Sequence, residues 1–252
     1  MSTPSPGADE PARPSFSDED AVPEHLPDHL EYLVIEGVIG AGKTTLARYI
    51  ARHFDAKLVL EEFEQNPFLE RFYENRKRWA FQTQLAFLAS RFRQQKELLA
   101  RDLFHRIVIS DYAFDKDRIF AHHNLEGDEL QLYETLFSLM EPNTPTPDLV
   151  VYLQSTPERL MENIAKRGRS YEEDMDPEYI EALHEAYNYY FFRYTKSPLL
   201  IVNASEIDFV ENQSELAELL RYIATGEHHG TTYVNPPSME TVDISDADAP
   251  AP

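Results

Sequence analysis

Short runs of apolar residues recur along the chain, separated by longer segments with helical periodicity. Each run is rich in β-branched residues and too short to form a helix. Apolar strands that alternate with helices are typical of a parallel sheet covered on both faces. We therefore predict an α/β fold with a five-stranded parallel sheet and right-handed connections. The predicted strands are residues 32–36 (YLVIE), 57–60 (KLVL), 106–110 (RIVIS), 148–153 (DLVVYL) and 198–203 (PLLIVN).

The segments between these runs have the period of helices, about 3.6 residues. The Pro-rich stretch EPNTPTPD at residues 141–148 instead predicts a turn before the fourth strand. The predicted helices are Thr44–Phe54, Pro67–Phe72, Arg78–Asp102, Asp128–Met140, Pro157–Arg167, Pro177–Tyr194 and Gln213–Ala224.

The two ends of the chain lack this pattern. Residues 1–27 and 228–252 are rich in Pro, Ser and acidic residues and poor in large apolar ones. Such segments bury too little apolar surface to offset the chain entropy lost on folding. We predict two disordered tails around a single domain at residues 28–227.

The charge and composition exclude several classes of protein. The formal net charge is −22, from 23 Lys and Arg against 45 Asp and Glu, which argues against binding to nucleic acids or anionic membranes. The chain has no cysteine, so disulfides, thiolate metal sites and cysteine nucleophiles are excluded. No apolar run reaches the roughly 18 to 20 residues of a membrane span, and the N-terminal residues lack the basic-then-apolar pattern expected of a signal peptide. We expect a soluble cytoplasmic protein.

The sequence GVIGAGKT at Gly37–Thr44 matches the phosphate-binding pattern G-x-x-x-x-G-K-[ST], and it stands between a predicted strand and a predicted helix. Its glycines leave backbone N–H groups free to surround a phosphate at a helix N-terminus. Lys43 is expected to reach the β- and γ-phosphates, and the Thr44 hydroxyl to bind Mg²⁺. The candidate nucleotide-binding residues are Gly37, Val38, Ile39, Gly40, Ala41, Gly42, Lys43, Thr44 and Thr45.

This motif does not by itself define a function. A glycine-rich turn with a purely structural role is the alternative, although the full order of strand, loop, lysine, hydroxyl and helix argues against it. Switch GTPases, ATP-driven machines and small-molecule kinases all contain such a P-loop. The function must therefore be inferred from other residues.

Two carboxylates follow predicted strands at the edge of the sheet that carries the P-loop. Glu61 follows the second strand and Asp111 follows the third, and ligands of open α/β sheets bind at this edge. One carboxylate suits the acceptance of a proton from an attacking hydroxyl, and the other suits Mg²⁺. A lone acid here is more often a helix cap or a solvated loop residue. The nearby P-loop favours the functional interpretation.

Several separated blocks of the sequence resemble the deoxyribonucleoside kinases, and the resemblance runs from about Tyr32 to Ile223. Among the branches of that family, the chain most resembles the bacterial purine deoxynucleoside kinases. This resemblance implies a P-loop fold with an arginine-bearing lid, ATP as phosphoryl donor, Mg²⁺ and a homodimer. The blocks are IEGVIGAGKTTL, EEFEQNPFLERFYENRKRWAFQTQLAFLASRF, SDYAFDKDRIFA and RGRSYEEDMDPEYIEALHEAY.

The resemblance also implies roles for individual residues. Glu61 matches the general base that acts on the sugar 5′-hydroxyl, whereas Glu62 stands where many members have proline. Tyr73 matches a tyrosine that hydrogen-bonds the 3′-hydroxyl, and Trp79 lies near the base pocket. The remaining matches are Gln84, which reads the base edge, Arg91 at the inner end of the pocket, and Phe120, which stacks on the base.

Spacing supports part of this assignment. Gln84, Phe87 and Arg91 fall on one face of a predicted helix, together with Leu88. A buried glutamine both donates and accepts hydrogen bonds, as reading a base edge requires. An aromatic stripe at this spacing is otherwise more often part of the core.

The sequence RGRSYEED at residues 167–174 resembles the lid of the family. Arg167 and Arg169 are then expected to clamp the transferring phosphoryl group, and Glu172 to bind the 3′-hydroxyl. A solvated charged loop is the alternative.

The sequence departs from the family at two places. Many members carry Asp/Glu-Arg-Ser after the third strand, but here Tyr112 and Ala113 follow Asp111. The missing arginine removes a cation near the 5′-hydroxyl, and tyrosine at this position resembles the deoxyguanosine-preferring branch. Asn163 replaces an arginine of many relatives, which puts stacking of the donor base in question.

We therefore expect transfer of the ATP γ-phosphoryl group to the 5′-hydroxyl of a purine deoxynucleoside, with deoxyguanosine preferred, in nucleotide salvage. The alternatives are deoxyadenosine or deoxycytidine kinase and, less closely, thymidine or thymidylate kinase. A P-loop regulatory module without kinase activity is a more remote alternative. The helices at residues 78–102 and 128–140 are candidates for a dimer interface.

Overall fold

The computed structural model describes residues 21–98, 105–205, 207, 212–226, 228–235 and 240–243. The rest of the two expected tails, residues 1–20, 236–239 and 244–252, lies outside these described residues.

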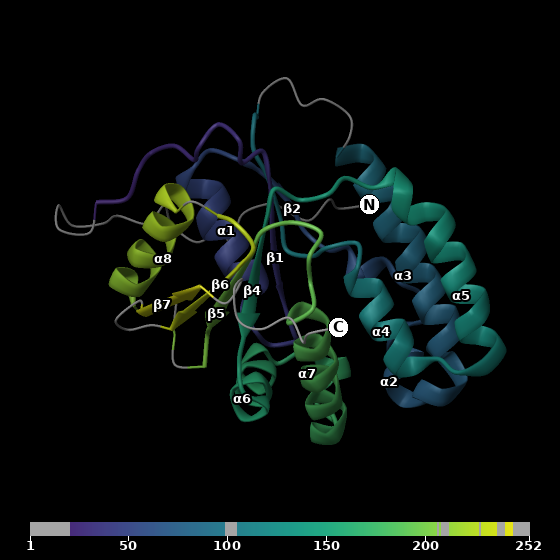
Figure 1. Ribbon diagram of the computed structural model, residues 1–252. Helices are drawn as coiled ribbons and strands as arrows, with labels where there is room; N and C mark the ends of the chain where they lie inside the picture. Colours follow the sequence, from purple (N-terminus) through teal and green to yellow (C-terminus); the bar gives the residue numbers. More distant parts are fainter. Residues whose placement is uncertain are drawn as a thin grey trace, which may run out of the picture.

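A seven-stranded sheet forms the centre of the molecule, with the strand order β2-β3-β1-β4-β5-β6-β7 (Figure 1). The first six strands along the chain are parallel to their neighbours, and β7 alone runs antiparallel, against β6. The strands are β1 Tyr32–Gly37, β2 Lys57–Val59, β3 Val108–Ser110, β4 Leu149–Gln154, β5 Leu199–Asn203, β6 Thr231–Asn235 and β7 Glu240–Asp243. The predicted parallel α/β architecture is confirmed.

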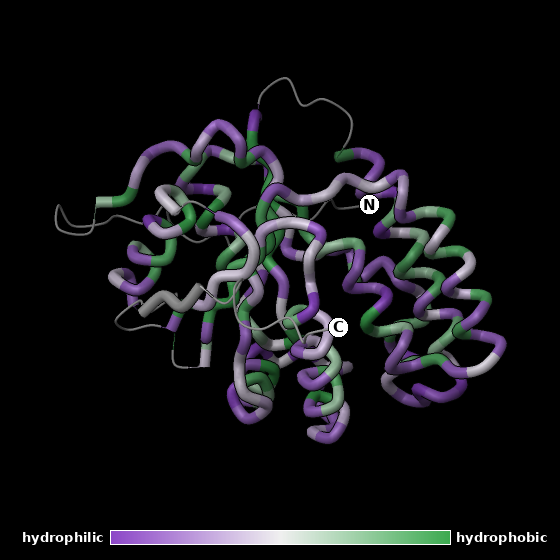
Figure 2. Tube along the Cα trace, viewed as in Figure 1, coloured by the Kyte–Doolittle hydropathy of each residue, from purple (hydrophilic) through white to green (hydrophobic). Residues whose placement is uncertain are grey.

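The central strands are apolar because helices cover both of their faces. Val34 and Ile35 of β1 and Val150 and Val151 of β4 are fully buried, and their register pairs Val34 with Val150. Figure 2 shows the hydrophobic residues concentrated on these central strands. Since β1 to β6 are parallel, their carboxyl ends meet at one edge of the sheet.

Helices α1 and α8 lie on one side of the strands, and α2 to α5 lie on the other (Figure 1). The helices are α1 Lys43–His53, α2 Leu69–Glu74, α3 Arg76–Leu98, α4 Lys116–Asn124, α5 Gly127–Met140, α6 Pro157–Arg167, α7 Pro177–Phe191 and α8 Gln213–Thr225. The end of the predicted helix Arg78–Asp102 lies outside the described residues. No helix in the described ranges combines the length and the apolar character needed to cross a membrane.

Helix α4 is absent from the sequence-based prediction. Its buried residues are Lys116, Asp117, Ile119 and Ala121, so half of its inward face is charged. A search for apolar periodicity does not detect such a helix. The two charged residues that obscured this helix in the sequence, Lys116 and Asp117, belong to the candidate site described below.

The sheet has two strands more than we predicted, and both belong to the expected C-terminal tail. Strand β6 pairs with β5, from Leu199 with Thr231 to Val202 with Val234. Its sequence, TTYVN, alternates polar and apolar residues and gives a weak strand signal because only Val234 is buried. The prediction of a disordered tail is therefore wrong for residues 228–235 and 240–243.

The described part of the expected N-terminal tail also packs on the domain. Leu26 is buried in the core, and the carbonyl oxygen of Pro23 lies 2.9 Å from Nε2 of His53 in α1. Isolated apolar residues in a Pro-rich segment gave no periodic signal. The ordered domain thus begins before residue 28.

Candidate active site

The P-loop connects β1 to α1 as its sequence predicts. Gly40 and Gly42 both have a φ of 88°, a conformation that favours glycine. A Cβ atom at Gly40 would lie 2.5 Å from the carbonyl oxygen of Leu160, so no side chain fits there. These glycines therefore allow the backbone to form the close turn at the start of α1 that a phosphate group requires.

The Lys43 side chain bends back over the P-loop. Its Nζ donates hydrogen bonds to the carbonyl oxygens of Gly37, at 2.8 Å, and Val38, at 2.9 Å. Burial and the neighbouring Lys116 cation lower the pKa of Lys43 to about 8. The ammonium group thus lies against the P-loop backbone, where the phosphates are predicted to bind.

Asp111 connects the P-loop to the end of β2. Its Oδ2 accepts a hydrogen bond from the Thr44 hydroxyl at 2.5 Å, and its Oδ1 accepts one from the backbone N–H of Glu61 at 2.8 Å. The carboxylate is 5% exposed. Three segments that are far apart in sequence are therefore held together by one side chain.

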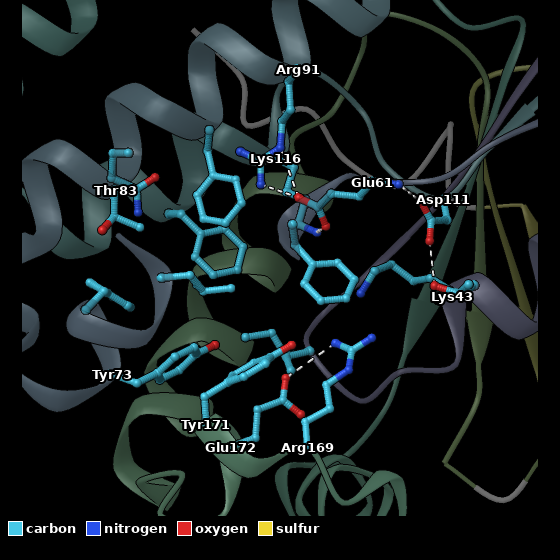
Figure 3. Close-up of a pocket in the computed structure, with 18 of the residues that line it drawn as sticks. Lys43, Glu61, Tyr73, Thr83, Arg91, Asp111, Lys116, Arg169, Tyr171 and Glu172 are labelled. Carbon is cyan, nitrogen blue, oxygen red and sulfur yellow. Dashed lines mark hydrogen bonds and ion pairs between the residues drawn. The ribbon is translucent and has the colours of Figure 1, made fainter. Parts of the chain in front are cut away.

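Glu61 lies between two cations (Figure 3). Its Oε1 accepts hydrogen bonds from Arg91, from Nε at 3.0 Å and from Nη2. Its Oε2 accepts one from Nζ of Lys116 at 2.5 Å. Burial alone would raise the pKa of Glu61, but the Lys116 and Arg91 charges hold this pKa well below its usual range. The neighbouring Glu62 is more exposed and contacts Arg93 instead.

Arg91 is buried and connects Glu61 with a second carboxylate. Its Nη1 contacts Oδ1 of Asp117, and Oδ2 of Asp117 accepts a hydrogen bond from the Tyr133 hydroxyl at 3.0 Å. The guanidinium also lies 4.6 Å from the centre of the Phe87 ring. Arg91 therefore links α3, α4 and the end of β2.

A cavity of about 110 Å³ opens at this edge of the sheet. It brings together most of the side chains that the sequence selected for chemistry or substrate binding. Among the residues selected for substrate binding, only Trp79 does not line it. The predicted residues that do line it are Ile39, Lys43, Thr44, Glu61, Tyr73, Gln84, Phe87, Arg91, Asp111, Phe120, Arg167, Arg169 and Glu172.

Trp79 and Tyr112 have other contacts. The Trp79 ring stacks on Phe68 at 5.9 Å. The Tyr112 hydroxyl donates to Oε1 of Gln94 at 2.9 Å, and Nε2 of Gln94 donates to the carbonyl oxygen of Leu60. Tyr112 is thus a buried support for the chain next to Glu61 and is not part of the cavity lining.

Gln84 provides an unpaired acceptor in the cavity lining. Its side chain is buried, and its Oε1 has no hydrogen-bond partner in the part of the chain that the structure describes. A buried acceptor without a partner costs about 1–3 kcal/mol. A ligand with an N–H group at this point would remove that cost.

The lid follows α6, which ends at Gly168 with a φ of 65°. Arg167 holds Glu172 through hydrogen bonds of 3.1, 2.7 and 2.6 Å, and Nη1 of Arg169 lies 3.6 Å from the same carboxylate. The ring of Tyr171 stacks on Tyr73 at 5.7 Å (Figure 3). The lid therefore meets the cavity at the residues predicted to bind the sugar.

Asn163, which replaces an arginine of many relatives, contacts the P-loop. Its Nδ2 donates to the carbonyl oxygen of Gly40 at 2.8 Å. This substitution therefore supports the backbone of the loop from α6.

The residues present fit ATP and Mg²⁺. The positive φ of Gly40 and the absence of space for a Cβ atom there give the backbone turn of a phosphate cradle. The Thr44 hydroxyl and Asp111 are oxygen donors of the kind that Mg²⁺ prefers. Within the described ranges, no group of three or more His, Asp or Glu residues is arranged to hold a metal ion. A metal here would therefore depend on phosphate oxygens and water for its other ligands.

Sequence reasoning missed several polar residues in and around this site, among them Lys116, Asp117, Tyr171 and the buried Glu36. Lys116 stands four residues before Phe120, and this spacing on one helix face was the available signal. Glu36 accepts hydrogen bonds from the backbone N–H groups of Gly37, at 3.1 Å, and Ala113, at 2.7 Å. Glu36 lies within the apolar strand β1, and its sequence context gave no indication of a role in the site.

Comparison with known proteins identifies the family. The sequence model of the family "Deoxynucleoside kinase" matches residues 33–226. A deoxyguanosine kinase of Bacillus subtilis is 32% identical over 197 residues, which are 76% of this chain and 95% of that protein. A deoxyadenosine/deoxycytidine kinase of the same organism is 28% identical over 211 residues, covering 81% and 96%.

A solved structure agrees with these relatives. The structure of deoxyadenosine kinase from M. mycoides with bound dATP superposes with a TM-score of 0.66 and 27% sequence identity, and it covers 75% of this chain and 97% of that one. Residues 33–226, which the family model matches, include the P-loop, Glu61, Gln84 and the lid. The chain therefore belongs to the deoxynucleoside kinase family.

Proposed function

We propose that this protein transfers the γ-phosphoryl group of ATP to the 5′-hydroxyl of a purine deoxynucleoside, with deoxyguanosine preferred, in nucleotide salvage. One observation carries the proposal. A single cavity is lined by the P-loop residue Lys43, by Glu61, by Gln84 and by the two lid arginines. The residues for a phosphate donor and for a base-bearing acceptor therefore share one space.

Glu61 orients the 5′-hydroxyl and accepts its proton. The pKa of this carboxylate is low, so it is a weak base before the reaction starts. The transition state of phosphoryl transfer is loose, and the attacking oxygen becomes acidic only as its bond to phosphorus forms. A well-oriented weak base is sufficient for such a late proton transfer.

The other charged residues act on the phosphoryl group. Lys43 leaves the P-loop carbonyls to meet the β- and γ-phosphates, and Arg167 and Arg169 approach from the lid. Thr44 and Asp111 would hold Mg²⁺, which when bound would neutralise charge on the phosphate oxygens.

The acceptor is recognised at both ends of the cavity. Tyr73 and Glu172 bind the sugar 3′-hydroxyl, and Phe120 and Phe87 pack against the base. Gln84 reads the base edge with its free Oε1 and its amide N–H₂. An adjacent donor and acceptor fit either purine, namely N1–H with O6 of guanine or the amino group with N1 of adenine.

Gln84 therefore does not choose between the purines. The preference for deoxyguanosine is supported by the deoxyguanosine kinase that is 32% identical. The deoxyadenosine/deoxycytidine kinase, at 28% identity, makes deoxyadenosine and deoxycytidine the alternatives. Tyr112, which favoured guanine in the sequence, supports the backbone and does not reach the cavity.

A panel of the four deoxynucleosides tests this proposal. ATP consumption is coupled to ADP release, and the nucleoside monophosphate is identified for each acceptor. We expect the highest kcat/KM with deoxyguanosine and the phosphate on the 5′-oxygen. Release of ADP that does not depend on any deoxynucleoside would indicate a regulatory nucleotide-binding module instead.

The Glu61→Gln variant tests the assignment of the base. The amide keeps the shape but cannot take the proton, so turnover should fall about 10²- to 10⁴-fold, with binding of the nucleoside largely kept. Glu62→Gln is the matched control, since its side chain is 37% exposed and pairs with Arg93. Turnover of Glu61→Gln within a few fold of wild type would remove Glu61 from the mechanism.

We also propose that the protein acts in the cytoplasm as a homodimer. Leu132 and Leu139 on α5 are 49% and 68% exposed, and such residues favour burial against a second copy. The net charge of −22 opposes partners of the same sign, such as nucleic acids and anionic membranes.

A further inference from the structure

Lys116 is buried at the centre of the site without a role in the mechanism above. It is 5% exposed, and it extends from the first turn of α4 to Oε2 of Glu61, at 2.5 Å. A buried lysine costs free energy unless its charge is compensated. Glu61 compensates it directly, and the buried Glu36 also interacts electrostatically with Lys116.

The hydrogen bonds to Glu61 are divided unequally between its two oxygens. Each carboxylate oxygen accepts about two hydrogen bonds. Oε1 already receives two, both from Arg91, whereas Oε2 receives one, from Lys116. The free position for a substrate hydroxyl is therefore on Oε2, beside the Lys116 ammonium group.

The ammonium group has three N–H donors, and Glu61 occupies one of them. A 5′-hydroxyl bound at Oε2 would lie next to the other two. Tyr112, which follows Asp111, supplies no cation here, since its neutral hydroxyl donates to Gln94 on α3.

We propose that Lys116 is a positioning residue for phosphoryl transfer, which fixes Glu61 so that Oε2 accepts the 5′-hydroxyl proton. This inference rests on the proposed function. When the 5′-oxygen bonds to phosphorus, its proton passes to Oε2, and the bond between the γ-phosphorus and ADP breaks. Lys116 keeps its own proton throughout.

The Lys116→Met variant tests this role in the full-length protein. Loss of one preorganised donor should lower kcat about 10²- to 10³-fold. KM for the nucleoside should change only a few fold, because Gln84, Tyr73 and Glu172 remain. Arg93→Met is the matched control, since it removes an exposed cation that contacts Glu62, and it should keep wild-type kcat within about twofold.

A double variant separates positioning from a general structural effect. If Lys116 acts through Glu61, then Lys116→Met combined with Glu61→Gln should lose little more turnover than Glu61→Gln alone. Losses that multiply would overturn the proposal, and so would a kcat of Lys116→Met within threefold of wild type.

If Lys116→Met lacks a cooperative thermal transition, two milder variants decide the question. Lys116→Arg keeps the cation and Lys116→Gln keeps only a neutral donor, so kcat should follow the order Lys, Arg, Gln. Turnover of the Gln variant equal to that of the Arg variant would overturn the proposal. Failure of the proposed function is distinct, because the wild-type protein would then show no deoxynucleoside-dependent release of ADP.

Discussion

At the scale of single residues, Arg91 is a buried cation that depends on two carboxylates. It is buried with two carboxylates, Glu61 and Asp117, and a cation in such a place is tolerated only when its partners are kept. Asp117 is fully buried and accepts its second hydrogen bond from Tyr133. The three charges form a unit whose members depend on one another.

The Asp117→Ala variant should therefore be strongly destabilised. Removing one partner of a buried ion pair costs about 3–5 kcal/mol, to be measured as the change in the free energy of unfolding in urea. Glu134→Ala is the control, because its pairs with Arg118 and His122 are partly exposed and such pairs are worth about 0–1 kcal/mol. Equal losses in the two variants would contradict the buried-pair account.

The sequence predicted those site residues that belong to a motif, follow a strand or share a helix face. The P-loop, Glu61 and Gln84 were found because a motif, a strand end or a helix face marked them. Lys116 and Asp117 were missed because their partners, Glu61 and Arg91, come from other parts of the chain. No pattern in the local sequence indicates that such charged residues are buried. Trp79 was placed near the base pocket, but the structure stacks it on Phe68, outside the cavity lining.

At the scale of elements, the lid is defined by the end of α6 and by one carboxylate. Gly168 ends the helix in the left-handed region, and the chain then turns so that Glu172 meets Arg167. Both oxygens of Glu172 are held by this arginine, so the carboxylate has a fixed orientation toward the cavity. The lid therefore combines the cation that we propose to bind the phosphoryl group with the acid that we propose to bind the sugar.

The Glu172→Gln variant tests this combination. Hydrogen bonds to charged groups contribute about 1.5–3 kcal/mol, so the wild-type enzyme should prefer a deoxynucleoside over its 2′,3′-dideoxy analogue by about tenfold or more. Glu172→Gln should lose most of this preference in kcat/KM, whereas the exposed neighbour Glu173 can be changed to Gln without effect. A preference that survives Glu172→Gln would assign the 3′-hydroxyl to another residue.

Elements with a regular apolar face were predicted to within a few residues, as β4 and α6 show. The missing elements share a physical reason. The inward face of α4 is half charged, and β6 has only one buried residue. Both are stabilised by partners supplied by the rest of the fold, so their own sequences carry little signal.

At the scale of the whole molecule, the exposed apolar residues of α5 lie on the side of the sheet covered by α2 to α5 (Figure 1). The proposed homodimer would bury Leu132 and Leu139 there. The wild-type protein should then sediment at twice its chain mass of 29.2 kDa.

A double variant, Leu132→Glu with Leu139→Glu, should shift this equilibrium toward the monomer, since a dimer would bury four unpaired carboxylates. Tyr189→Glu is the control, because this residue is 65% exposed on a different helix, α7. Analytical ultracentrifugation over a range of concentrations measures both. A wild-type monomer, or a dimer that the double variant leaves intact, would remove α5 from the interface.

Asp111 has a consequence for how the two substrates bind. One of its oxygens holds the P-loop hydroxyl of Thr44, and the other holds the backbone of Glu61. In the proposed mechanism, a change on the donor side would reach the acceptor side through this single carboxylate. Coupling between two sites is reciprocal. By whatever factor the nucleotide changes the affinity for the nucleoside, the nucleoside must change the affinity for the nucleotide by the same factor.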